Sequence, residues 1–75
     1  MAMKISVEGN KVIGTHNGSG EQTLLAVCDD AAKAAELMER GWAFNDKRQY
    51  TKAARTFAAA EALPGFAWAP YKEIE

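Results

Sequence analysis

The chain has 75 residues, of which 48% are hydrophobic, and its formal net charge is -1 at pH 7. This length allows one domain (residues 1–75) with a core near the lower limit for independent stability, so a protein partner or a homodimer could complete it. The nearly balanced charge excludes a chain-wide attraction to nucleic acid, and no apolar run approaches the roughly 18 residues of a membrane span.

The number of cysteines and the pattern of the first residues indicate the cellular compartment. The single cysteine, Cys28, excludes an intrachain disulfide and suits a reducing compartment. The first residues alternate apolar and polar side chains, so no secretory signal is expected. We therefore expect a cytoplasmic protein without membrane contact.

The first two elements are predicted to form a β-hairpin. Residues 3–8 and 11–16 both carry apolar side chains at strand spacing, and Gly9-Asn10 between them fits a two-residue type II′ turn. The implied cross-strand pairs are Val7 with Val12, Ile5 with Gly14 and Met3 with His16. The inner face is then Met3, Ile5, Val7 and Val12, and Ile13 points the other way.

A third strand is predicted over residues 21–28, after a connection of turn residues at 17–20. Strict alternation places Thr23, Leu25 and Val27 on one face and Leu24, Ala26 and Cys28 on the other. Because both faces are apolar, we expect this strand to lie inside the sheet or to be well covered.

Two helices are predicted next. Asp29-Asp30 supplies an N-cap for a helix over residues 31–40, with Gly41 as the residue that ends it. Asp46, followed by Gln49, has the pattern of a capping box for a second helix that reaches about Leu63. The apolar stripes are Ala31, Ala34, Ala35, Met38 and Trp42 on the first helix, and Tyr50, Ala53, Ala54, Phe57, Ala60 and Leu63 on the second.

The predicted fold class is α+β. A three-stranded antiparallel sheet (residues 3–28) is followed by an αα-hairpin (29–64) that packs on it, in the order βββαα, and by an aromatic tail (65–75).

The helical hairpin resembles a single tetratricopeptide-type repeat, a helix-turn-helix unit used for protein binding. The residues that carry this resemblance lie between Leu37 and Pro64: Gly41, Ala43, Phe44, Tyr50, Ala53, Phe57, Ala60 and Pro64. The resemblance implies close helix approach at the small residues, with aromatic rings filling the gaps. A structural αα-hairpin that uses the sheet in place of neighbouring repeats meets the same steric demands, and we prefer this interpretation.

One basic stripe is a candidate binding site. Arg48, Lys52 and Arg55 are spaced i, i+4 and i+7, so a continuous helix would align them on one face that could grip an acidic protein surface. The alternative is an ordinary solvated helix face. Nucleic acid is disfavoured as the partner because no aromatic residues interleave with these charges.

The aromatic tail is the second candidate. Phe66, Trp68 and Tyr71 fall within six residues, and Trp and Tyr are enriched at interface anchors. The alternative is that the rings fold back to cover the alanine-rich core.

Catalytic and metal chemistry have little support. His16 and Cys28 are the only residues of their types, and a nucleophile–base pair also needs a third orienting group. Two such ligands cannot close a tetrahedral zinc shell. We expect no catalytic residues, no metal and no cofactor, and hence a protein that is not an enzyme.

The sequence therefore favours a small non-enzymatic protein-binding module. By analogy of size and style alone, it fits a phage or mobile-element inhibitor or adaptor, of which anti-CRISPR proteins are an example, that occupies a surface of a larger complex. Exposed acidic residues such as Glu36 and Glu39 could mimic nucleic-acid charge. The alternative is a nucleic-acid-binding regulator that uses the basic face of the second helix.

Overall fold

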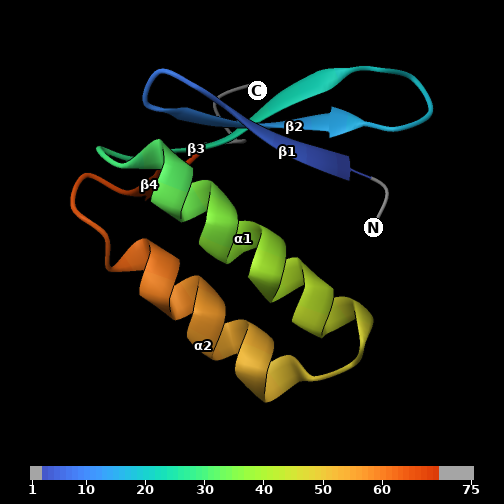
Figure 1. The fold of residues 1–75 in the computed structure, drawn as a ribbon, viewed down its shortest axis with the longest axis vertical. Helices are drawn as coiled ribbons and strands as arrows, with labels where there is room; N and C mark the ends of the chain where they lie inside the picture. Colours follow the sequence, from blue (N-terminus) through green and yellow to red (C-terminus); the bar gives the residue numbers. More distant parts are fainter. Residues whose placement is uncertain (1–2, 70–75) are drawn as a thin grey trace.

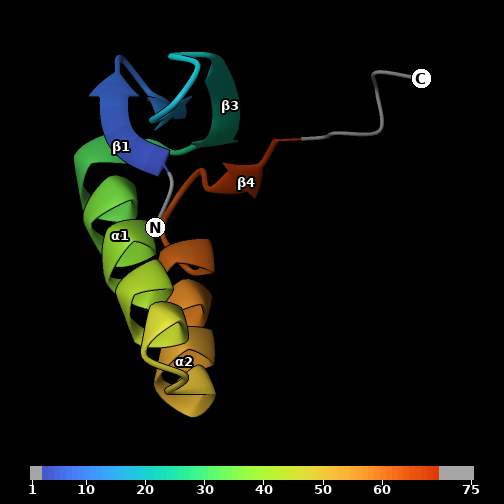
Figure 2. The same ribbon diagram turned by 90° about the vertical axis from the view of Figure 1, so that its right-hand side faces the viewer.

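The computed structural model describes residues 3–69, which form an α+β fold (Figures 1 and 2). The elements in chain order are β1 (Met3–Glu8), β2 (Lys11–His16), β3 (Gln22–Val27), α1 (Ala31–Asp46), α2 (Tyr50–Glu61) and β4 (Ala67–Trp68). The strands form one antiparallel sheet in the order β1-β2-β3-β4. The α+β class and the strand-then-helix order are as predicted.

The sheet has a fourth strand that the sequence did not predict. After α2 the chain returns to the sheet, where Ala67 and Trp68 pair with Val27 and Ala26 of β3. The N–H of Ala69 extends this pairing by donating to the Leu25 carbonyl at 2.9 Å. A strand of two residues is too short to show any alternation, so the segment was assigned to an aromatic tail. Its presence confirms the interior position expected for β3.

The first hairpin agrees with its prediction in both register and turn. Val7 pairs with Val12, Ile5 with Gly14 and Met3 with His16. Gly9 has a φ of +63°, which is the conformation that the first central residue of a type II′ turn requires. Val7 lies at the open end of the inner face and is 43% exposed, so it contributes little to the core.

A β-bulge corrects the predicted faces of β3. The register shifts between Val12, which faces Ala26, and Ile13, which faces Leu24, so that Leu25 is an extra residue on β3. Leu25 and Ala26 are consecutive, yet both are buried in the same core cluster. A bulge sets two neighbouring residues of one strand against one residue of the other, which strict alternation cannot anticipate.

Helix α1 begins where it was predicted to begin but is longer. The Asp30 side chain accepts the Lys33 N–H at 3.1 Å, which confirms the N-cap. The helix then continues through Gly41 to Asp46, so the prediction that Gly41 ends it is wrong. Gly41 is instead a buried interior residue that faces Phe57 of α2, and a Cβ at this position would lie 2.8 Å from the ring's Cζ. The glycine is needed for close approach of the two helices.

Helix α1 lies between the sheet and α2. It contacts β1 and β2 on one side and packs along α2 on the other, whereas α2 lies farther from the sheet (Figures 1 and 2). The prediction that both helices pack on the sheet is therefore correct only for α1. The buried hydrophobic residues are mostly small: Ile5, Val12, Leu25, Ala26, Cys28, Ala31, Ala34, Ala35, Met38, Ala53 and Ala60.

We predict that Gly41→Ala lowers the free energy of unfolding by about 1 kcal/mol. At an open helical site this change is stabilising by a similar amount, but here the added methyl group overlaps the Phe57 ring. Urea denaturation would measure the change.

The matched control is the same substitution in a Phe57→Leu background, where the shorter side chain leaves room. In that background Gly41→Ala should be neutral or stabilising. An increase in stability when Gly41→Ala is made in the otherwise unchanged protein would contradict the close-approach interpretation.

Candidate functional site at the interhelical turn

The turn between α1 and α2 closes with a Schellman motif. The N–H of Gln49 donates to the Phe44 carbonyl and the N–H of Arg48 donates to the Asn45 carbonyl, both at 2.9 Å. This is the pairing of a helix C-terminus that ends in a left-handed residue. Arg48 occupies that left-handed position, with a φ of +62°.

This turn corrects the predicted start of the second helix. Asp46 is the last residue of α1, and α2 begins at Tyr50 with Gln49 at the N-cap position. Because Asp46 belongs to α1 and Gln49 holds the N-cap position without a side-chain capping bond, the predicted capping box does not start α2. The pattern of an acidic residue followed three positions later by glutamine spans the end of α1 and the turn before α2.

Arg48 is the only non-glycine residue between positions 3 and 69 with a positive φ. The left-handed conformation brings the Cβ of an L-residue too close to its own backbone, which costs roughly 1 kcal/mol compared with glycine. Such strained positions cluster at functional sites. The Schellman motif accounts for the left-handed conformation, and an arginine in place of the usual glycine leaves a modest strain at this turn.

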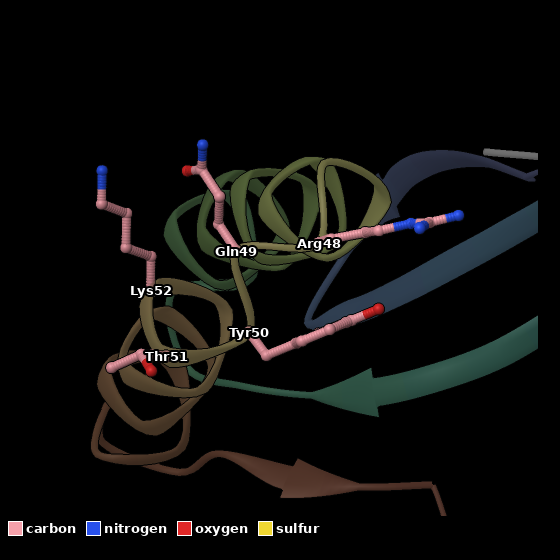
Figure 3. Close-up of a pocket in the computed structure, with 5 residues that line it drawn as sticks. All are labelled: Arg48, Gln49, Tyr50, Thr51 and Lys52. Atoms are coloured by element: carbon pink, nitrogen blue, oxygen red, sulfur yellow. The ribbon is translucent and has the colours of Figure 1, made fainter.

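A shallow depression lies at this turn. Its volume is about 350 Å³, and it is lined by Arg48, Gln49, Tyr50, Thr51 and Lys52. Figure 3 shows the side chains of Arg48 and Tyr50 extending in a similar direction, while Gln49 and Lys52 project away from them. Tyr50 is 61% exposed, the highest value among the large apolar side chains of the described chain.

Tyr50 was expected in the apolar stripe of the second helix, and that expectation is wrong. It is the first residue of α2, beyond the reach of the α1 surface that buries Ala53. Its ring is therefore largely exposed to solvent. We call Arg48 and Tyr50, with the depression that they border, the turn site.

The predicted basic stripe does not form as a straight line. Arg48 precedes α2 and lies in the left-handed turn, so the i, i+4 spacing to Lys52 carries no helical meaning. Lys52 lies over the Phe44 ring, with its Nζ 5.8 Å from the ring centroid. Only Lys52 and Arg55 share helical spacing on α2, and Arg48 projects away from Lys52 (Figure 3).

The other predicted site residues fold back onto the helices. The rings of Trp42, Phe57, Trp68 and Phe66 form a continuous series with centroid separations of 5.5, 6.3 and 5.1 Å. The indole N–H of Trp68 donates to Glu61 Oε2 at 2.6 Å. Trp42, Phe57 and the half-buried Phe66 pack against the alanine-rich core. Trp68 is 40% exposed and contacts the rings of Phe57 and Phe66. Tyr71 lies outside the described residues.

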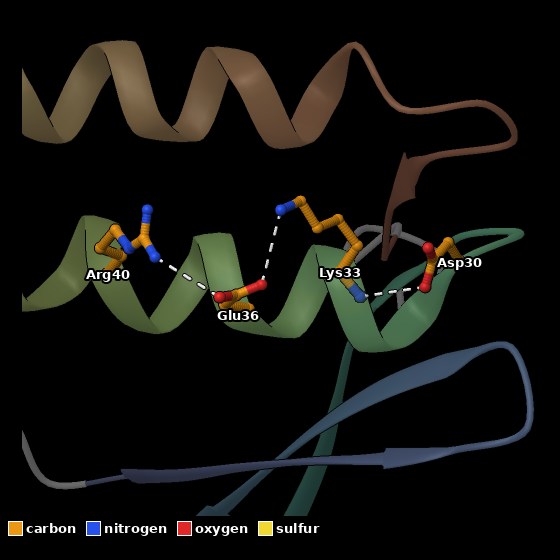
Figure 4. A network of polar contacts seen from close by, with 4 residues as sticks. All are labelled: Asp30, Lys33, Glu36 and Arg40. Carbon is orange, nitrogen blue, oxygen red and sulfur yellow. Dashed lines mark hydrogen bonds and ion pairs between the residues drawn. The ribbon is translucent and has the colours of Figure 1, made fainter.

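The exposed face of α1 offers less free charge than its composition suggests. Glu36 lies 3.6 Å from Lys33 Nζ through one carboxylate oxygen and 3.4 Å from an Arg40 guanidinium nitrogen through the other (Figure 4). The Glu36 carboxylate is thus shared by two cations of its own helix, all three side chains being about half exposed. Glu39 is exposed on the same helix.

His16 and Cys28 lie at opposite ends of the sheet. The His16 N–H donates to the Glu21 carbonyl at one end of β2, and the Cys28 N–H donates to Asn10 before the other end. Six residues of strand separate these points by about 20 Å. The thiol is buried and donates to the Pro64 carbonyl at 3.5 Å. The two side chains therefore do not form a nucleophile–base pair.

Residues 3–69 contain no group of three or more His, Cys, Asp and Glu side chains placed to hold a metal ion. Over the same range, neither helix has the length and apolar character that crossing a membrane requires. Comparison with known proteins identifies no relative: no family model, curated protein or solved structure matches this chain significantly.

We predict that Arg48→Gly raises the free energy of unfolding by about 1 kcal/mol, because glycine adopts the left-handed conformation without the Cβ penalty. Arg48→Ala should leave stability within about 0.5 kcal/mol of its original value, because it removes the exposed guanidinium but keeps the Cβ. Thermal denaturation of both variants would distinguish the backbone effect from the charge effect. Equal stabilisation by the two substitutions would contradict this prediction.

We predict that Trp68→Ala lowers the free energy of unfolding by about 2 kcal/mol, since the ring contacts Phe57 and Phe66 and remains partly exposed. Tyr50→Ala should change it by less than about 0.5 kcal/mol, because most of that ring is in solvent. Chemical denaturation would measure both values. Equal losses would contradict the distinction between Trp68, which packs on two other rings, and Tyr50, which lies mostly in solvent.

Proposed function

We propose that the chain is a non-enzymatic protein-binding module, acting as an inhibitor or adaptor, that uses the turn site against an acidic surface of a larger protein. The observation that carries this proposal is an exposed tyrosine next to an arginine held in a strained backbone conformation, both bordering a depression. Tyrosine and arginine are among the residues most enriched at interface hot spots.

The position of the turn supports the proposal. Figure 2 shows the helical hairpin extending away from the sheet, so that the turn lies at the tip of the molecule. A partner can therefore contact it without disturbing the core around β2 and α1. Lys52 and Arg55 on the adjoining part of α2 add positive charge, which favours an acidic partner and accelerates encounter.

Affinity capture of the tagged full chain from cell lysate, followed by mass spectrometry, tests this function. The unmodified chain and Ser19→Ala, a control on the β2–β3 loop, should recover the same stoichiometric protein complex. Tyr50→Ala should bind that complex at least about 30-fold more weakly, the loss typical of a hot spot, while remaining folded. Arg48→Gly should also bind more weakly despite its greater stability. Equal recovery by all variants, or recovery of no protein, would overturn the proposal.

The basic residues near the turn support one alternative function, that of a nucleic-acid-binding regulator. Its signature would be binding to DNA or RNA that weakens steeply as salt increases, because each phosphate contact releases counterions. Fluorescence anisotropy at low salt measures this directly. Salt-dependent binding lost on replacement of Lys52 and Arg55 would favour the alternative over the protein-binding module.

A further inference from the structure

Strand β1 is a long, open sheet edge. It lies at one side of the strand order and has six residues, whereas the opposite edge, β4, has two. Edge strands are usually protected from further pairing by short length, charged side chains, proline or a bulge, and of these β1 carries only the charges of Lys4 and Glu8. β1 contains no proline, and it pairs with β2 in an unbroken register. Within the described range 3–69, no strand covers its outer side.

Backbone hydrogen bonds show which residues of β1 face that open side. His16 at one end of β2 donates its N–H to Glu21, and Asn10 before the other end accepts from Cys28. Even-numbered residues of β2 therefore bond towards β3, and its odd-numbered residues bond towards β1. In the observed register these odd-numbered residues face even-numbered residues of β1. The odd-numbered residues of β1 are thus left with backbone groups directed to the open edge.

We propose that β1 is a homodimer interface, in which β1 of a second copy pairs antiparallel about a two-fold axis at Ser6. Each Lys4 then faces the partner's Glu8, and each Ile5 faces the partner's Val7. The outward backbone groups of Ile5 and Val7 form the hydrogen-bonded pairs, as an antiparallel ladder requires. The segment Lys4–Glu8 is therefore complementary to itself in backbone, charge and shape, which a two-fold interface demands.

Charge selects this register over its neighbours. The odd-numbered residues must pair with odd-numbered residues, so the register can shift only in steps of two. A shift by two residues places Lys4 opposite the partner's Ser6 and removes both opposite-charge pairs. Lys4 and Glu8 are exposed in the single chain and free to meet a partner on the face of the sheet away from the helices.

The apolar side chains of β1 are the second argument for a dimer at this edge. Val7 is 43% exposed at the edge, next to Ile5, which is 8% exposed. In the dimer the partner's Ile5 covers Val7, so an exposed aliphatic side chain of the isolated chain becomes buried. Because five residues form only a small contact, we expect a weak, concentration-dependent dimer.

Charge reversal tests the proposal. Sedimentation velocity up to about 1 mM protein should detect dimers of the unmodified chain. Lys4→Glu sets like charges opposite each other twice and should weaken dimerisation about tenfold or more, and Glu8→Lys should do the same. The double exchange Lys4→Glu/Glu8→Lys should restore it. An equimolar mixture of the two single variants should form a heterodimer, because each supplies the charges that the other lacks.

This mixture also controls for folding, since a misfolded variant could not be rescued by its counterpart. A monomeric unmodified chain throughout this concentration range would overturn the proposal. So would single variants that dimerise as well as the unmodified chain.

A cross-linking experiment tests the position of the axis. Ser6 faces the partner's Ser6 in a non-hydrogen-bonded pair, where Cα atoms lie about 4.5 Å apart, a separation that a disulfide can span. Under mild oxidation Ser6→Cys should give a covalent dimer much faster than Ser19→Cys, an exposed control on the β2–β3 loop. Cys28 stays in place in both, because it is 1% exposed. Equal cross-linking rates for the two variants would place the interface elsewhere and overturn the proposal.

Discussion

Helix α1 has to be covered on two sides, by the sheet and by α2, and the small side chains along it make this double contact possible. Ala31, Ala34, Ala35 and Gly41 are all buried, and Met38 between them is fully enclosed. Small residues bring neighbouring backbones close, which increases the dispersion contacts that a core of limited volume can make. The fold depends on this central helix because α2 has few contacts with the sheet of its own.

Aromatic rings fill the space that the small residues leave between the two helices. The Phe57 ring fills the space over Gly41 and contacts Trp42, while Trp68 reaches the same ring from β4. The pairing of β4 with β3 and the bond from Trp68 to Glu61 hold the returning chain against α2. The two helices and the returning strand are thus connected through a single series of rings.

Two surfaces remain outside this core, and they lie on different elements. The turn site is at the far end of the helical hairpin, where strain at Arg48 and exposure of Tyr50 coincide. The open edge of β1 belongs to the sheet. A dimer formed through β1 would carry two turn sites, so the proposed partner could be bound at two points with an avidity that neither site has alone.

Elements with local sequence signals were predicted correctly. The register of the first hairpin followed from alternation and the two-residue turn at Gly9, and the start of α1 followed from the capping residue Asp30. The remaining features depend on contacts between distant parts of the chain, which local patterns do not contain. Gly41 lies inside α1, where the absence of a Cβ makes room for the Phe57 ring of α2. Leu25 is buried together with Ala26 because the β-bulge interrupts the alternation of side chains along β3. Trp68 becomes part of a strand because β3 offers it a partner. For the same reason the sequence indicates the turn site only in part. The charge of Arg48 is evident from the sequence, but its left-handed backbone and the exposure of Tyr50 depend on where α1 ends and α2 begins.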